Sequence, residues 1–186
     1  MTSPARERIL DAAYNLFCAR GVQRVGVDEL ISTANVAKAT FYRHFASKDE
    51  LVLAFLERRE EIFTEGYLHA EMARRGGGPE DQLMAVFDIF DDWFNQHDFE
   101  PCSYIRLLLD IGPDHPLGRA SVAYLEKVRL SIRELGEAAG LVDPEDFSHS
   151  FTILLKGSIV AAVGTDTQAA QRARRMGARL IEAHRP

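Results

Sequence analysis

Five side chains that can form hydrogen bonds with a nucleic acid lie between residues 38 and 44, and a sixth lies at residue 48. They carry ammonium, guanidinium, hydroxyl, phenol and imidazole groups: Lys38, Thr40, Tyr42, Arg43, His44 and Lys48. Phe41 and Phe45, four positions apart, are expected to face a core if the segment is helical. The polar residues and Ala39 must then cover the outer surface, which contains no carboxylate between residues 38 and 44. Such a surface suits a helix lying in the major groove of DNA.

A second short helix is predicted just before this one. Val27, Leu30 and Ile31 form an apolar stripe with i, i+3, i+4 spacing. The segment Thr33-Ala34-Asn35-Val36 supplies the break between the two helices. Asparagine tolerates the left-handed backbone conformation that a tight turn needs. Residues 27–48 therefore predict a helix-turn-helix.

An amphipathic helix is predicted near the N-terminus. Its apolar positions follow the i, i+3, i+4, i+7, i+8 pattern of a helix with one buried face, namely Ile9, Ala12, Ala13, Leu16 and Phe17. Gly21 is well suited to end it. Arg6 and Arg8 lie at its start, where contact with a DNA phosphate and simple solvation of the charges both remain open.

The segment from Ala37 to Phe45, AKATFYRHF, together with Ser47-Lys48-Asp49-Glu50-Leu51, resembles the DNA-binding motif of the TetR family of bacterial transcriptional regulators. The resemblance is close over about the first 55 residues, and beyond them only the helical architecture and a few local motifs fit. It implies that Thr40, Tyr42, His44 and Lys48 hold phosphates. It also implies that Lys38 and Arg43 reach guanine edges or phosphates. The implied DNA-binding residues are Gly26, Val27, Lys38, Ala39, Thr40, Tyr42, Arg43, His44 and Lys48.

Three positions depart from the family pattern. Gly26 stands where a Ser or Thr usually caps the helix and can bind a phosphate. Asp28 replaces a residue that is often basic or polar, and Ala37 replaces a capping Ser. Glycine still permits the cap conformation and leaves backbone N–H groups directed at an anion. We expect the fold to survive these changes, whereas DNA affinity and the preferred operator are open.

The remainder of the chain is predicted to be helical. Ser47 and Glu50 form a capping box that begins a helix of about 28 residues, roughly 40 Å long. Its apolar pattern includes Leu51, Phe55, Ile62 and Leu68, and it ends at Gly76-Gly77-Gly78-Pro79. Further helices are expected at about 81–95, 102–111, 117–139, 144–163 and 167–184, with Asp143 as an N-cap. The fold class is all-α, about nine helices, with a helix-turn-helix domain at 1–48 and a ligand-binding and dimerisation domain at 49–186.

The resemblance also implies two roles for the predicted body. Its last two helices are expected to pair with their copies in a homodimer, through Phe147, Leu154, Gly157, Ser158, Ala161, Ala169, Ala173, Met176 and Leu180; packing only within the monomer is the alternative. Some aromatic and polar side chains are expected to line a cavity for a small apolar or aromatic effector. The candidates are Phe63, Phe87, Phe90, Trp93, Cys102, Tyr104, Tyr124 and Phe151.

Charge is distributed unevenly along the chain. Residues 1–48 carry 7 Lys and Arg against 4 Asp and Glu, whereas residues 49–186 carry 15 against 24, within an overall net charge of −6. A basic head on an acidic body can approach DNA through one face. With only two cysteines, no apolar run long enough to cross a bilayer and no secretory signal, we expect a cytoplasmic protein. The resemblance implies that it is bacterial and associated with the nucleoid.

Catalytic and metal-binding patterns are weak. A di-iron site in a helical bundle needs two Glu-x-x-His turns, and only the segment Asp146–His149 comes near that spacing. His97, Cys102 and His115 lie in separate segments, which does not favour a zinc site. We therefore expect no enzyme activity, no metal and no cofactor.

Together these patterns predict a sequence-specific transcriptional regulator. We expect a repressor that binds a near-palindromic operator as a dimer and leaves it when an effector binds the body. A helical small-molecule-binding protein or enzyme that has lost operator recognition is the alternative, and an activator also remains open. The sequence identifies neither the effector, nor the operator, nor the target genes.

Overall fold

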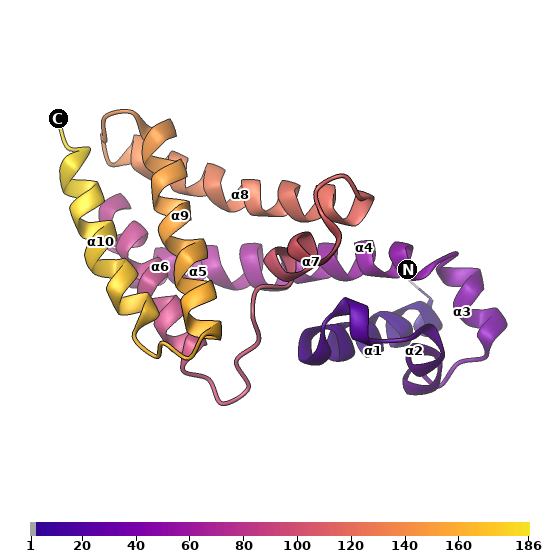
Figure 1. Cartoon of the computed structure of the whole chain (residues 1–186). Helices are drawn as coiled ribbons and strands as arrows, with labels where there is room; N and C mark the ends of the chain where they lie inside the picture. The colour runs from indigo at the N-terminus through magenta and orange to yellow at the C-terminus, as the bar shows by residue number, and fades with distance from the viewer. Residues whose placement is uncertain (1–2) are drawn as a thin grey trace. The chain divides into compact units, whose positions relative to one another are not determined.

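The computed structural model describes residues 3–186, which form helices joined by short loops (Figure 1). No β-strand occurs within that range, as the sequence predicts. The chain divides into two compact units. Unit 1 contains the described residues up to Ile62 together with Cys102–Tyr124, and unit 2 contains Phe63–Pro101 and Leu125–Pro186. The predicted division into a DNA-binding domain at 1–48 and a ligand-binding and dimerisation domain at 49–186 concerns function, and it stays a prediction.

Unit 1 is built around an N-terminal helix that contacts three others. Helix α1 (Pro4–Arg20) packs against α2 (Val27–Thr33), α3 (Lys38–His44) and α4 (Lys48–Arg59). A 3-10 turn, η1 (Val22–Arg24), follows the predicted cap at Gly21, whose φ is +80°. Unit 1 also holds α7 (Ser103–Ile111) and the first part of α8 (Pro116–Ala138). Its core consists of side chains at most 2% exposed, including Ile9, Ala13, Phe17, Leu30, Phe41, Phe45, Leu51 and Phe55.

A continuous helical run extends from Lys48 to Arg75, close to the predicted length. It begins at the predicted cap, where Ser47 Oγ accepts a hydrogen bond from the Glu50 amide at 3.2 Å. The run contains a π-helix, η2 (Glu60–Leu68), between α4 and α5 (His69–Arg75), which the sequence did not predict. The π-helical register turns Glu60 and Thr64 inward, 3% and 2% exposed. Ile62, expected in the apolar stripe, instead points outward and is 52% exposed.

Unit 2 packs three helices closely around an aromatic core. Helix α9 (Pro144–Val163) and helix α10 (Ala169–Ala183) run side by side, orange and yellow in Figure 1, and both contact α6 (Pro79–Phe94). Gly177 on α10 allows this approach, since a Cβ there would lie 2.5 Å from the Phe87 ring. Asp143 caps α9 as predicted, accepting a hydrogen bond from the Asp146 amide at 3.2 Å. With the run from Lys48 to Arg75 counted once, residues 3–186 form nine helices and the short η1 turn.

Candidate nucleic-acid interface

The helix-turn-helix has the geometry that the sequence predicts. Between α2 and α3, Asn35 adopts a φ of +50°, the left-handed conformation expected of the turn. Leu30 of α2 and Phe41 of α3 are both fully buried, and Phe45 just after α3 is 1% exposed. These three residues fix which side of α3 faces the core. The opposite side of α3 therefore faces away from this core.

The predicted DNA-binding residues of α3 lie on this outer side. Lys38, Ala39, Tyr42 and Arg43 are exposed, whereas Thr40 and His44 are half-buried. The Tyr42 ring is 45% exposed even though it lies edge-on to Phe41, with ring centroids 5.3 Å apart. An aromatic ring and two cations are thus presented together on one helix surface. That combination can contact phosphates, sugars and base edges.

Two arginines of α1 contact residues of the helix-turn-helix segment. Arg8 Nε donates a hydrogen bond to the carbonyl of Ala34, at the C-terminal end of α2, over 3.3 Å. The guanidinium of Arg6 lies over the Phe45 ring, 5.1 Å from its centroid. These partners are far apart in the sequence, so no local pattern could reveal the pairing. In this structure both arginines position the motif.

A carboxylate lies beside one of the predicted contact residues. Asp28 Oδ1 of α2 is 3.7 Å from Lys38 Nζ of α3, and both side chains are largely exposed, at 90% and 68%. An ion pair so exposed to water contributes little to folding. It does place a negative charge next to a cation on the outer surface. Asp28 therefore lies where it can compete with an anionic ligand for Lys38.

The first turns of α2 and α4 supply the remaining predicted contacts. Gly26 is the N-cap of α2 with a φ of −85°, no side-chain cap, and open space around a Cβ built at that position. Val27 follows it and is half-buried. Lys48 begins α4, and burial lowers the pKa of its amine, with Asp49 acting in the opposite direction. Backbone N–H groups at such helix starts are suited to bind phosphate.

The eight predicted effector-binding residues fall into three groups. Cys102, Tyr104 and Tyr124 belong to unit 1, and the two tyrosine rings lie 5.2 Å apart. In unit 2, Phe63 and Phe90 pack on Trp93 with centroid distances of 5.5 and 5.4 Å. Phe87 and Phe151 are fully buried and pack on each other at 5.0 Å. Phe87 and Phe151 thus belong to the core of unit 2, and the eight residues are divided between the two units.

Tyr104 is tied to the helix that follows the recognition motif. Its hydroxyl donates a hydrogen bond to the carbonyl of Leu56 on α4, over 3.2 Å. Burial is the main cause that raises the pKa of Tyr104, and the charge of Glu60 adds to it. Burial followed by the charges of Glu57, Glu60 and Glu61 raises the pKa of Tyr124 as well. Both phenols therefore act as neutral hydrogen-bonding groups near neutral pH.

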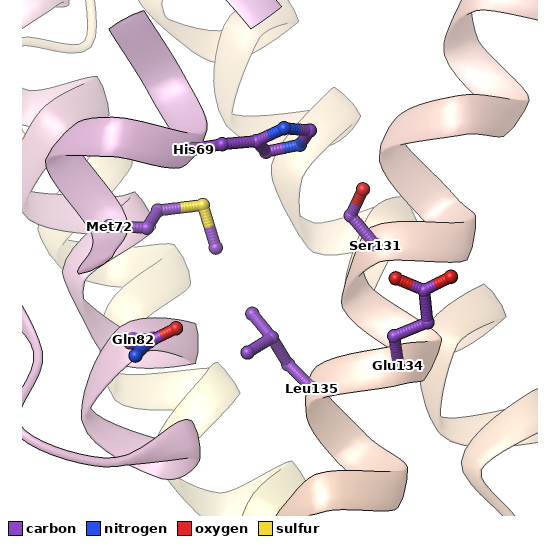
Figure 2. Close-up of a pocket in the computed structure, with 6 residues that line it drawn as sticks. All are labelled: His69, Met72, Gln82, Ser131, Glu134 and Leu135. Carbon is purple, nitrogen blue, oxygen red and sulfur yellow. The ribbon is translucent and has the colours of Figure 1, made fainter. Parts of the chain in front are cut away.

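Unit 2 contains a pocket that the sequence did not predict. Its volume is about 320 Å³, and it is lined by His69 and Met72 of α5, Gln82 of α6, and three residues of α8, Ser131, Glu134 and Leu135. Figure 2 shows the His69 ring and the Leu135 side chain pointing into it from opposite sides. His69 Nε2 is buried without a hydrogen-bond partner. The lining residues come from three separate helices, and none is among the eight predicted ones.

The predicted dimer residues are divided between interior and surface. Phe147, Ser158, Ala169 and Ala173 are at most 6% exposed within unit 2, so they are not available to a partner chain in this structure. Gly157 and Met176 are exposed, and Leu154, Ala161 and Leu180 are half-buried. Three apolar residues of α9 missed by the prediction are strongly exposed: Ile153 at 69%, Val160 at 59% and Val163 at 54%. Their spacing with Gly157 makes a stripe along α9.

Comparison with known proteins agrees with this geometry. The family described as "Bacterial regulatory proteins, tetR family" matches residues 9–55, the segment that forms most of α1 through α4. A TetR-family transcriptional regulator from Streptomyces coelicolor superimposes with a TM-score of 0.84 at 25% identity, over 97% of this chain and 95% of its own.

The segment from residue 9 to residue 55 matches the TetR family, and the chain shares the fold of TetR-family regulators.

Other relatives extend the likeness. A TetR-type regulator from Streptomyces avermitilis superimposes with a TM-score of 0.76 at 26% identity, over 98% of both chains. The transcriptional activator FasR of Mycolicibacterium smegmatis is 37% identical over 93 residues, 50% of this chain and 41% of FasR. The transcriptional repressor NemR of Escherichia coli is 30% identical over 108 residues, 57% of this chain and 53% of NemR. The chain thus spans about half the length of these two curated relatives.

Two further findings concern the described part of this chain. No helix within residues 3–186 is long and apolar enough to cross a membrane. In the same range, no three or more His, Cys, Asp or Glu side chains are grouped so that they could hold a metal ion. The named relatives are transcriptional regulators, and none of those names describes an enzyme.

Proposed function

We propose that this protein is a sequence-specific DNA-binding transcriptional regulator that acts as a homodimer. The observation that carries this proposal is the outer surface of α3, where Lys38, Tyr42 and Arg43 are exposed above a core made by Phe41 and Phe45. A packed helix has no structural need for an exposed tyrosine between two cations. A DNA major groove gives all three a partner.

The proposed interface makes two kinds of contact with DNA, one with base edges and one with phosphates. Lys38, Ala39 and Arg43 approach base edges, while Thr40, Tyr42, His44 and Lys48 hold phosphates. Gly26 and Val27 add backbone N–H groups at the start of α2, where no side chain competes for them. Phosphate contacts fix the position of a protein on the duplex, whereas base contacts distinguish sequences. This division assigns operator choice to three residues only.

The exposed stripe of α9 is the proposed dimer contact. Ile153, Val160 and Val163 are each more than half exposed, and Gly157 between them leaves room for a close approach. Met176 of α10, 55% exposed, extends the apolar surface. A twofold pairing through these residues sets two α3 helices on one DNA. Successive major grooves on one side of a duplex are about 34–36 Å apart, which is the spacing expected of a near-palindromic operator.

We propose a repressor that a small effector releases from DNA. An effector acts only through a difference in its affinity for the DNA-bound and the released state. The aromatic residues around Trp93 and the pocket in Figure 2 are two candidate sites, the second with a volume at the small end of ligand pockets. A compound that stabilises the wild type against thermal unfolding, but does not stabilise Leu135→Trp, binds in the pocket. A compound whose stabilising effect is lost in Trp93→Ala and kept in Leu135→Trp binds at the aromatic site.

Binding of labelled DNA from upstream of the protein's own gene tests the central proposal. Fluorescence anisotropy at two salt concentrations, with an unrelated duplex as control, separates specific from general binding. We expect affinity for the upstream DNA well above the control at both salts. The proposal is contradicted if the protein binds both duplexes equally weakly and loses this binding at the higher salt. Fragments from the whole genome must then show the same weak, salt-sensitive binding.

A helical ligand-binding protein without operator recognition is the second candidate. Specific observations favour it: the N-cap residues of α2 and α3, Gly26 and Ala37, carry no hydroxyl group that could bind a phosphate, and Asp28 lies beside Lys38. Each weakens a phosphate contact. The same anisotropy experiment distinguishes the two candidates, because this alternative predicts ligand binding with no preference among DNA sequences.

A further inference from the structure

Arg59 places a buried positive charge beside the thiol of Cys18 in unit 1. Arg59 is 8% exposed, and its Nη1 donates a hydrogen bond to Sγ of Cys18 over 3.1 Å. The two residues are 41 positions apart and belong to α4 and α1. Cys18 is only half-buried, which leaves it an approach from solvent. A guanidinium beside a thiol favours the thiolate, the nucleophilic form of cysteine.

Three other ionisable groups surround the same guanidinium. Burial lowers the pKa of Arg59, but its interactions with Cys18, Tyr14, Cys102 and Tyr104 outweigh burial and raise the pKa above its ordinary value. All four of these groups become negative when they lose a proton. Thiols lose it more readily than phenols do, with ordinary pKa values of about 8.5 and about 10. Cys18 is the thiol that accepts the hydrogen bond from Arg59 Nη1, so its thiolate is stabilised most directly by the positive charge.

We propose that Cys18 is an oxidative modification site whose reactant is a small hydroperoxide. The thiolate sulfur attacks one peroxide oxygen, so that an S–O bond forms while the O–O bond breaks. Sulfur loses two electrons and the peroxide gains them. With hydrogen peroxide, the leaving hydroxide takes up the proton that the thiol released. The products are a cysteine sulfenic acid and water.

Oxidation alters the contact between α1 and α4. The added oxygen must be accommodated where Arg59 Nη1 now lies 3.1 Å from the sulfur. Helix α1 supplies Ile9 and Phe17 to the core of unit 1, and Arg8 to the end of α2. A shift of α1 therefore disturbs the support of the helix-turn-helix, and we expect weaker DNA binding. This consequence rests on the proposed function, whereas the chemistry of Cys18 does not.

The rate of oxidation tests the site itself. The intact chain is treated with hydrogen peroxide at pH 7 with dimedone, which traps sulfenic acids, and the adduct on the Cys18 peptide is followed by mass spectrometry. We expect Cys18 to react about tenfold faster than glutathione, because the guanidinium of Arg59 increases the fraction of the thiol that is present as thiolate. Arg59→Met should remove this advantage and Arg59→Lys should keep most of it. A Cys18 rate equal to that of glutathione, or unchanged in Arg59→Met, overturns the proposal.

Two controls keep the test independent of how the variants fold. Cys102→Ser removes the second thiol near Arg59, and Cys18 should still react at the wild-type rate. Loss of Cys18 oxidation in Cys102→Ser overturns the assignment. Wild-type protein unfolded in urea loses the contact without any substitution, so its Cys18 should react at the glutathione rate. A fast reaction that persists in the unfolded chain also overturns the role of Arg59.

DNA binding before and after peroxide treatment tests the consequence. We expect treated wild type to lose about tenfold or more in affinity and treated Cys18→Ser to keep its affinity, which supports regulation through Cys18. Treated wild type that binds as well as before overturns the regulatory consequence. Untreated protein that does not bind any DNA refutes the proposed function instead, and the dimedone rates then decide the modification site alone.

Discussion

Helices α3 and α9 each bury one face and expose the other, but what they expose differs in kind. The outer side of α3 carries Lys38, Tyr42 and Arg43, whereas that of α9 carries Ile153 and Val160. Both surfaces are open to a further partner. For α3 a suitable partner is polar and negative, and for α9 it is apolar. This difference fits the two partners proposed above, DNA for α3 and a second copy of the chain for α9.

The largest effect is expected from a charge placed in the α9 stripe. Ile153→Glu should weaken dimerisation by about 30-fold or more, because a buried unpaired carboxylate at an interface core is costly. Ile153 is 69% exposed in the monomer, so its folding should hardly change. Analytical ultracentrifugation measures the dimer dissociation constant. Leu109→Glu on α7, at a position 76% exposed, is the matched control and should remain dimeric. An unchanged dimer in Ile153→Glu would remove α9 from the interface.

A substitution on the outer side of α3 should weaken DNA binding without affecting dimerisation. Tyr42→Ala should lower operator affinity by about tenfold or more, the loss of one or two good contacts to DNA, and leave the dimer intact. Tyr67→Ala, at a 39% exposed tyrosine of η2, is the matched control and should bind DNA like the wild type. Operator titrations by anisotropy measure the affinities. If Tyr42→Ala and Tyr67→Ala behave alike, the outer side of α3 is not the DNA-binding surface.

The features that distinguish these two helices could be predicted from the sequence only in part. The turn at Asn35, the cap at Ser47 and the inward phenylalanines follow from local spacing and turn chemistry, and the structure confirms them. The stripe of Ile153 and Val160 was missed, because periodicity locates an apolar residue on a helix without saying which of two apolar faces meets the core of its own chain. Phe147 and Ile153 are equally apolar, and only packing separates them.

Other features lay beyond local pattern altogether. The π-helical register from Glu60 to Leu68 has no sequence signal among those used, and it reverses the expected direction of Ile62. The contacts of Arg8 with Ala34 and of Arg59 with Cys18 join residues 26 and 41 positions apart. Such pairs exist only once the helices have packed. The pocket around His69 likewise needs three helices in place.

Lys48 offers a smaller but more specific test of the polar surface. If Lys48 holds a phosphate, Lys48→Ala should reduce the slope of log affinity against log salt by about one and weaken all DNA sequences alike. Lys127→Ala, on the exposed part of α8, removes the same charge far along the chain and should leave the slope unchanged. Affinities at four or more salt concentrations give the slope. A slope that stays at the wild-type value in Lys48→Ala contradicts the phosphate contact.

The smallest effect should be a gain. Asp28→Asn removes the carboxylate 3.7 Å from Lys38 Nζ, so that Lys38 is available to DNA, and affinity should rise about threefold at low salt. The exposed pair contributes little to folding, so the thermal midpoint should be nearly unchanged. Glu29→Gln changes the net charge equally, but Glu29 pairs with Arg20 and not with a residue of α3. If both variants gain alike, the increase reflects overall charge. A gain confined to Asp28→Asn shows that the acidic residue on α2 restrains the very cation that α3 presents, and that the polar surface can be strengthened one contact at a time.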